Sequence, residues 1–153
     1  MKLAIVSDTH NNLANFKKAI DWIKKEKIQL ILHCGDISSQ ETINEAKAYF
    51  KGEIKYVRGN ADYGLETIPY SDDTELGDKK IAFAHFPDVA KKMAQSQKYD
   101  LVFYGHTHRP WEEKVGDCRF INPGELAGQF YKPSFAVYDT ETDNLELKIL
   151  ESL

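Results

Sequence analysis

Seven side chains of the kinds that bind metal ions each occur just past a short apolar run, and this recurrence constrains the fold more than any other feature. The seven residues are Asp8, His10, Asp36, Asn60, His85, His106 and His108. The apolar runs span residues 3–6, 30–32, 54–57, 81–84 and 101–104, and each has the length of one strand. Ligands in open α/β folds bind beyond the carboxyl ends of strands. Strands lying together would therefore bring the seven side chains into one crevice, and the pattern predicts a two-metal hydrolase.

The first sixty residues read as strand, helix, strand, helix, strand. A helix beginning at Asn11 or Asn12 would place Leu13, Phe16, Ile20 and Ile23 on one face. A second helix is expected over about residues 40–50, with Ile43, Ala46 and Phe50 inward. Strand-helix-strand repeats with short joints indicate parallel pairing of the strands at 3–6, 30–33 and 54–57.

The second half of the chain indicates antiparallel hairpins. Turns are expected at Gly77-Asp78, at Gly116-Asp117 and over residues 141–144, and a helix over about 88–97 precedes the strand at 101–104. Two mixed sheets packed face to face with helices outside would accommodate both halves. The expected class is α/β with mixed α+β character, formed by one domain over residues 1–153.

Composition excludes several classes of function. The formal net charge of −4 argues against broad binding to a nucleic-acid backbone, but it leaves room for a phosphate substrate because bound metals would dominate the local charge. No apolar stretch approaches the roughly 20 residues of a membrane span, and no signal peptide is apparent. Two cysteines without CxxC spacing, Cys34 and Cys118, fit reduced thiols, and a cytoplasmic location is expected.

Each of these residues alone has a plainer explanation than metal binding. An Asp or Asn after a strand usually caps a turn, and a single histidine is usually a packed or surface residue. Four of the five histidines nevertheless follow the strand-end pattern, which makes the joint arrangement hard to explain structurally. The fifth, His33, is either a residue that supports a ligand or a buried hydrogen-bonded side chain. A packing role is expected for Cys34.

The motifs, taken in order, resemble the calcineurin-like metallophosphoesterase superfamily. They are D-x-H at 8–10, G-D at 35–36, G-N-x-D at 59–62, His85, G-H-T-H at 105–108 and Ile121-Asn-Pro-Gly124. The small, single-domain prokaryotic phosphodiesterase branch without a cap domain is the most similar. The resemblance covers Met1 to about Gly124 and implies a four-layer α-β-β-α sandwich with a dinuclear centre. One metal would be held by Asp8, His10, Asp36 and His108, and the other by Asp36, Asn60, His85 and His106.

Three positions depart from the pattern of the family. Many relatives carry a histidine where this chain has Ala61, so a helper for protonating the leaving group is missing. Phe86-Pro87 follows His85 where glycine is usual, and Glu125 stands where relatives tend to have serine. The last two differences are expected to bear on substrate choice. None of the three removes a proposed metal ligand.

The chemistry expected of this centre is hydrolysis of a small phosphoester. Two divalent ions about 3.5–4 Å apart can share a hydroxide that attacks phosphorus in line, with Asp36 bridging the ions and Asn60 and His10 near the phosphate. Arg109 either neutralises a phosphate oxygen or forms a surface ion pair. Oxygen and nitrogen ligands without sulfur suit manganese as the first choice, with nickel, iron and zinc as alternatives.

The sequence allows two other functions, and it allows two positions for the aromatic residues near the site. A phosphomonoesterase would use the same centre, and a retromer subunit with a similar fold serves as a non-enzymatic interaction scaffold. All seven ligand positions are filled here, which favours an enzyme over the scaffold, and the missing histidine at Ala61 favours a phosphodiesterase. Four aromatic residues either rim the site or pack elsewhere, namely Phe86, Trp111, Phe130 and Tyr131. A homo-oligomer is one option for the assembly, and no membrane partner is expected.

Overall fold

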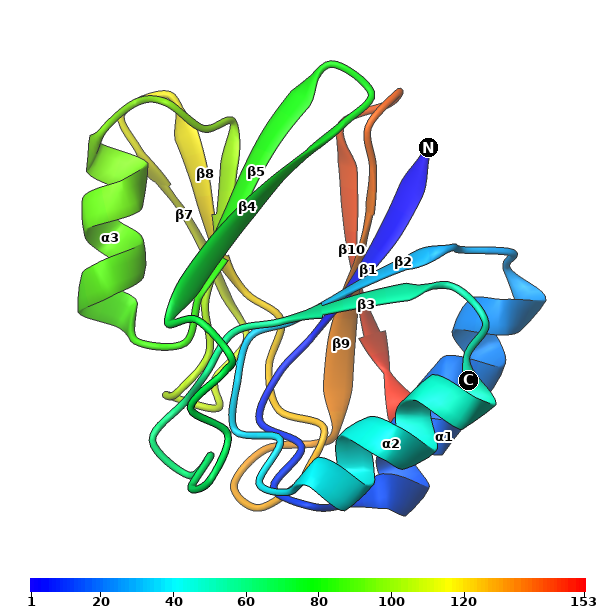
Figure 1. Cartoon of the computed structure of the whole chain (residues 1–153). Coiled ribbons are helices and arrows are strands. Elements are labelled where there is room, and N and C mark those ends of the chain that lie inside the picture. Colours follow the sequence, from blue (N-terminus) through cyan, green and yellow to red (C-terminus); the bar gives the residue numbers. More distant parts are fainter.

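Two five-stranded mixed sheets lie face to face, and helices cover their outer faces (Figure 1). The computed structural model describes residues 1–153. The strand order is β10-β9-β1-β2-β3 in the first sheet and β4-β5-β6-β8-β7 in the second. The expected fold class, two mixed sheets flanked by helices, is confirmed.

The first sheet combines the N-terminal β/α units with the C-terminal hairpin. Its elements are β1 (Lys2–Val6), α1 (Leu13–Lys25), β2 (Leu30–His33), α2 (Gln40–Tyr49), β3 (Glu53–Tyr56), β9 (Ser134–Asp139) and β10 (Asn144–Ile149). Strand β2 pairs in parallel with β1 and β3, as expected from the strand-helix-strand pattern. Strand β9 pairs antiparallel with β1 and β10. The carboxyl ends of β1, β2 and β3 therefore meet at one edge of the sheet.

The second sheet has a parallel centre and antiparallel edges. Its elements are β4 (Ser71–Leu76), β5 (Lys79–Ala84), α3 (Pro87–Gln95), β6 (Leu101–Phe103), β7 (Trp111–Val115) and β8 (Cys118–Asn122), and a short 3₁₀ helix, Leu150–Ser152, ends the chain. Strand β6 pairs in parallel with β5 and β8, while β4 and β7 close the edges antiparallel. Because β5 and β6 are parallel neighbours, their carboxyl ends lie at the same edge of the second sheet.

Three apolar clusters separate four layers. The first cluster lies between the first sheet and its helices and includes Phe16, Ile20 and Ile23 of α1. The second joins the two sheets and includes Leu32, Cys34, Phe83 and Phe103. The third lies between the second sheet and α3 and includes Ala90, Ala94 and Phe120. The layer order is therefore α-β-β-α, and Cys34 packs between the sheets.

Local details of the helices differ little from expectation. Asn12 is the N-cap of α1, and its side chain accepts a hydrogen bond from Asn15 N at 3.0 Å. Leu13 and Ile43 are only partly buried, and α2 buries Thr42 beside Ala46. Helix α3 ends at Gln95, two residues earlier than expected. None of the helices combines the length and apolar character needed to cross a bilayer.

Candidate metal centre

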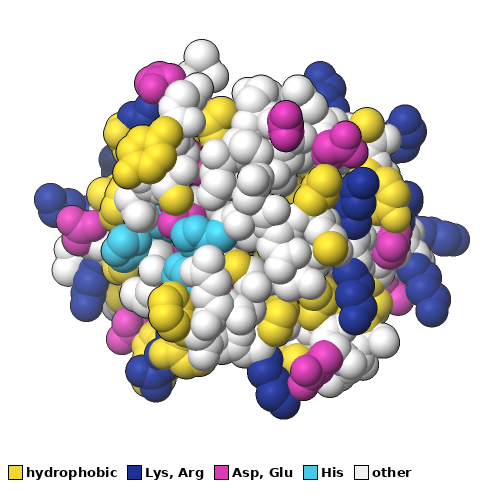
Figure 2. All heavy atoms as spheres, turned by 90° about the horizontal axis from the view of Figure 1, so that it is seen from below, with side chains coloured by type: hydrophobic (Ala, Val, Ile, Leu, Met, Phe, Trp, Pro, Cys, Tyr) yellow, Lys and Arg dark blue, Asp and Glu magenta, His cyan; other side chains and the backbone are white.

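The loops that leave β1, β2, β3, β5 and β6 meet at the lower end of the molecule in Figure 1. They carry all seven proposed metal ligands, which the structure brings into one cluster. Asp8, Asp36 and His85 form a buried floor, while Asn60 and His106 are exposed at the rim. Figure 2 views this face directly and shows the histidines gathered beside acidic atoms, with apolar surface on either side.

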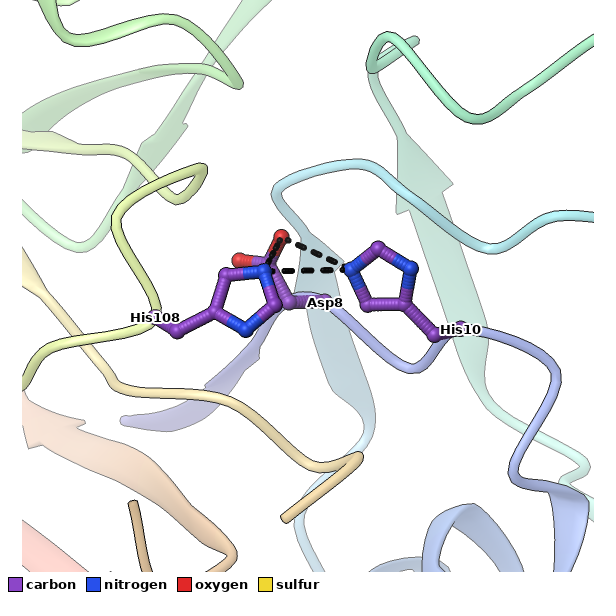
Figure 3. A group of neighbouring side chains, drawn as sticks. All are labelled: Asp8, His10 and His108. Carbon is purple, nitrogen blue, oxygen red and sulfur yellow. Dashed lines mark hydrogen bonds and ion pairs between the residues drawn. The ribbon is translucent and has the colours of Figure 1, made fainter. Parts of the chain in front are cut away.

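The first half of the cluster consists of Asp8, His10 and His108 (Figure 3). Asp8 Oδ1 lies 3.5 Å from His10 Nε2 and 3.4 Å from His108 Nε2. The two imidazole nitrogens are 3.2 Å apart. Three lone-pair-bearing atoms from β1 and β6 loops thus converge on one point.

The second half consists of Asn60, His85 and His106. Asn60 Oδ1 lies 3.0 Å from His85 Nε2 and 3.1 Å from His106 Nδ1. The two histidine nitrogens are 3.3 Å apart. His106 therefore lies beside Asn60 and His85, whereas His108 lies beside Asp8 and His10.

Asp36 lies between the two halves. Its Oδ2 is 3.4 Å from His10 Nε2 on one side and 3.4 Å from His85 Nε2 on the other. Its Oδ1 accepts a hydrogen bond from Ala61 N at 2.8 Å, which fixes the carboxylate. This is the position that a carboxylate bridging two ions would need.

The donor atoms fit divalent cations. Two atoms bonded to one ion at about 2.0–2.2 Å lie roughly 3–3.6 Å from each other, and the spacings above fall in this range. Asp8 Oδ1 is fully buried and has no hydrogen-bond partner, so a desolvated carboxylate oxygen is left facing two imidazoles. A buried charged oxygen without a partner is costly, and a bound cation would satisfy it.

The carboxylates of the floor have perturbed acidities. Burial would raise the pKa of Asp8, but the contact with the His10 ring, the charges of His85 and His108 and the hydrogen bond from Ser7 outweigh burial and lower it. Burial raises the pKa of Asp36. The nearby Asp8 carboxylate raises the pKa of His10 despite the partial burial of the ring. Perturbed acidities of this kind are typical of functional sites.

Five of the seven proposed ligands have left-handed backbone. Their φ angles are 51° for Asp8, 45° for His10, 58° for Asp36, 71° for His106 and 65° for His108. Left-handed backbone costs roughly 1–2 kcal/mol for a residue with a Cβ. Such strain concentrates at ligand-binding sites, where the surrounding structure enforces it.

Asp62 holds the ligand loops together, a role that sequence reasoning missed. It is buried, and its Oδ2 accepts hydrogen bonds from Asp36 N at 2.9 Å and Gly59 N at 2.8 Å. Its Oδ1 accepts from Ser38 N at 2.7 Å. The G-N-x-D motif contained this residue, but only its place between the β2 and β3 loops gives it a function.

Glu125 supports His108 from below. It is fully buried, and its carboxylate accepts a hydrogen bond from His108 Nδ1 at 3.0 Å, which directs Nε2 toward Asp8. Its oxygens also accept from the backbone N–H groups of Gln129, Phe130 (3.1 Å) and Tyr131 (3.3 Å). From the sequence, Glu125 was expected only to affect substrate choice, because relatives tend to have serine at this position. In the structure, its side chain instead contacts a proposed metal ligand, His108.

His33 connects two of the ligand loops. Its Nδ1 accepts a hydrogen bond from Gly35 N at 3.1 Å, so Nε2 carries the proton and donates to Thr9 Oγ1 at 2.6 Å. Burial lowers its pKa to about 4, so the ring is neutral. His33 is thus both buried and hydrogen-bonded, next to the ligand-bearing turns.

Of the other residues named from the sequence, Phe86 and Phe130 lie beside the histidines of the centre. Arg109 is exposed, and its guanidinium carbon lies 4.6 Å from the ring centroid of Trp111. The ring of Phe130 is 5.2 Å from that of His108, and the ring of Phe86 is 5.3 Å from that of His106. Two of the four aromatic residues named from the sequence therefore border the centre, on opposite halves.

Comparison with known proteins identifies the family. The family model of the calcineurin-like phosphoesterase superfamily domain matches residues 1–143 of this chain. The chain belongs to this superfamily. It is 34% identical to phosphodiesterase MJ0936 of Methanocaldococcus jannaschii, an alignment that covers 99% of this chain and 100% of the relative.

Solved structures of other proteins share the fold. An archaeal phosphodiesterase superposes with a TM-score of 0.88 at 32% identity, covering 97% of this chain and 99% of that one. Vps29 of Chaetomium thermophilum superposes with a TM-score of 0.77 at 21% identity, covering 97% and 93% of the two chains. The first is similar in sequence and fold, and the second in fold alone.

Proposed function

We propose that this phosphoesterase is a metal-dependent phosphodiesterase with two divalent cations. The first cation would be held by Asp8, His10, Asp36 and His108, and the second by Asp36, Asn60, His85 and His106. The observation that carries the proposal is the place of Asp36 Oδ2, 3.4 Å from a histidine nitrogen of each half. One carboxylate oxygen between two sets of ligands suits a two-metal centre.

The donor set bears on which metal binds. The seven side chains offer carboxylate and amide oxygens and imidazole nitrogens but no sulfur, because Cys34 packs between the sheets. Such sets suit manganese, nickel, iron or zinc better than calcium. Manganese is the proposed metal, with the other three as alternatives.

The side chains around the centre have separable roles in the proposed reaction. The bound cations would supply an activated water for in-line attack on phosphorus and would hold a phosphoryl oxygen. Asn60 at the exposed rim and the half-buried His10 are the proposed residues that orient the phosphate. Arg109 is the proposed contact to a further phosphate oxygen. Ala61 offers no proton to the leaving group, which favours diesters whose alcohol departs without help.

Two alternatives share this geometry. A phosphomonoesterase would use the same ligands and differ only in substrate. A protein-interaction scaffold is suggested by the likeness to Vps29, which extends to the fold alone. The complete set of seven ligands and the unpartnered Asp8 Oδ1 favour an enzyme over a scaffold.

The proposal is tested by hydrolysis of bis(p-nitrophenyl) phosphate with metal-stripped protein, before and after addition of Mn²⁺, Ni²⁺, Fe²⁺ or Zn²⁺. Activity that appears only with metal, and that exceeds the activity on p-nitrophenyl phosphate, is the expected result. A preference for the monoester would favour the phosphomonoesterase. Folded protein that turns over neither substrate with any of these metals would favour the scaffold.

A further inference from the structure

A cavity of 280 Å³ opens directly beside the metal centre. Asn60, a proposed ligand of the second cation, forms one of its walls, together with Arg58, Tyr63, Tyr70 and Phe86. Phe86 also contacts the centre, because its ring lies 5.0 Å from that of His85. A group attached to a phosphate at Asn60 would therefore enter this cavity.

Two largely exposed tyrosine rings line the cavity. Tyr63 is 86% exposed and Tyr70 is 53% exposed, although large aromatic rings are usually covered. The guanidinium carbon of Arg58 lies 4.2 Å from the ring centroid of Tyr70, and Arg58 also donates a hydrogen bond to the Tyr70 hydroxyl. Exposed rings gathered at one concave site are typical of ligand recognition.

The backbone around the cavity is held in place before any ligand binds. Arg58 N donates to Pro69 O at 2.8 Å, which closes the segment between β3 and β4 on itself. Within this segment Leu65 and Asp62 are buried, and Asp62 is hydrogen-bonded to three backbone N–H groups. The walls are thus preformed, which lowers the entropic cost of binding.

We propose that this cavity binds the aromatic ring of one ester arm of a phosphodiester, an aryl group or a nucleobase, while the phosphate lies at the metal centre. The inference rests on the proposed function and names its substrate class. Pockets that hold a drug-sized ligand measure about 300–1,000 Å³, so a cavity of 280 Å³ suits a ring and not a second whole nucleotide. Asp62 and Glu66 also line the cavity and outnumber its one cation, Arg58, so the net negative charge disfavours a second phosphate there.

Binding of two phosphonates to the manganese-loaded protein tests the proposal. Phenylphosphonate and methylphosphonate carry the same metal-binding group, resist hydrolysis and differ only in the ring. Wild-type protein should bind phenylphosphonate about tenfold more tightly, as measured by calorimetry, since stacking of one ring has roughly this effect. The Tyr63→Ala/Tyr70→Ala double variant removes two exposed rings without opening the core. It should bind the two phosphonates with affinities equal to within about twofold.

Controls separate this inference from the proposed function. Tyr131→Ala removes an exposed tyrosine outside the cavity and should keep the preference for phenylphosphonate. Methylphosphonate should bind wild type and the double variant alike, because it reports on the metal centre alone. Equal affinities in wild type, or a preference that survives in the double variant, would overturn the aromatic subsite while leaving the phosphodiesterase intact. Failure of both phosphonates to bind in the presence of manganese would overturn both.

Discussion

At the scale of single residues, the carboxylates of this protein differ in function according to what surrounds them. Asp36 faces the histidines of both halves, Asp8 presents an oxygen with no hydrogen-bond partner, and Glu125 reaches the centre only through His108. All three are buried. Position relative to the imidazoles, and not residue type, distinguishes a bridging role from a supporting one.

Asp36→Asn should reduce metal occupancy and activity together. The amide has the size of the carboxylate but lacks the charge that would hold two cations. We expect a loss larger than the roughly 10–100-fold that removing a residue supporting a ligand costs. Metal content per chain and kcat/KM for bis(p-nitrophenyl) phosphate are measured on the same preparation. Full activity in the variant would show that Asp36 does not bridge the ions.

Glu125→Gln should weaken metal binding about 10–100-fold, because neutral glutamine supports the His108 ring less well and presents an amide N–H₂ to backbone donors. Calorimetric titration with Mn²⁺ measures the effect. Glu75→Gln, which changes an exposed glutamate on β4, serves as the matched control and should bind Mn²⁺ as wild type does. Unchanged affinity in Glu125→Gln would mean that His108 is oriented by its loop alone.

At the scale of elements, the proposed ligands lie on the turns that follow the strands, and the strands fix the positions of these turns. Strands β2 and β6 are buried throughout and β1 is buried except at Lys2, and each leads into a turn that contains left-handed residues. Rigid, buried strands fix where these turns begin. Hydrogen bonds between turns, such as Asp8 N to Gly35 O at 3.0 Å and His10 N to Asp36 O at 2.9 Å, then hold the strained backbone.

His33 at the end of β2 should make stability depend on pH. Its pKa is about 4 in the folded protein and about 6.5 when exposed, so the unfolded chain binds more protons between these values. The contribution of His33 is complete above about pH 6.5 and is lost as the pH falls toward 4. Between pH 7 and 5, metal-free wild type should lose about 2 kcal/mol more unfolding free energy than His33→Gln.

Urea unfolding of both proteins at several pH values measures this difference. The comparison cancels the contributions of the acidic residues that the two proteins share. Parallel pH profiles for wild type and His33→Gln would show that the neutral, buried ring does not govern the acid sensitivity.

At the scale of the whole molecule, the metal centre spans both sheets. Asp8, His10, Asp36 and Asn60 follow strands of the first sheet, whereas His85, His106 and His108 follow strands of the second. The apolar cluster between the sheets holds these two sets of loops at a fixed separation. A cation bound by both sets would tie the two sheets together.

Manganese should therefore stabilise the folded protein, because the ligand set exists only when the sheets are packed. At a concentration 100 times the Kd the gain is about 2.7 kcal/mol, which corresponds to a rise in Tm of roughly 5–10 °C for a chain of this size. Thermal unfolding with Mn²⁺ and with a chelator measures the shift. Asp36→Asn is the control, and its Tm should change little when Mn²⁺ is added. An identical Tm with metal and with chelator would contradict a metal site that bridges the sheets.

The sequence by itself determined the elements and named the candidate ligands. Strands and helices follow from local periodicity, so their places could be predicted within a few residues, and the overall class followed from their order. The seven ligands could be named because carboxylate, amide and imidazole groups carry their chemistry wherever they lie. The resemblance to the family implied that these residues form two sets, one for each metal ion.

Tertiary structure alone decided how those groups act. His10 and His108 are 98 positions apart and meet only because the two sheets pack face to face. The same packing left Asp8 Oδ1 without a partner, enforced left-handed backbone at five ligands and placed the buried Glu125 beneath His108. No local pattern specifies these features, because each depends on distant segments whose separation is fixed by burial of the apolar faces between them.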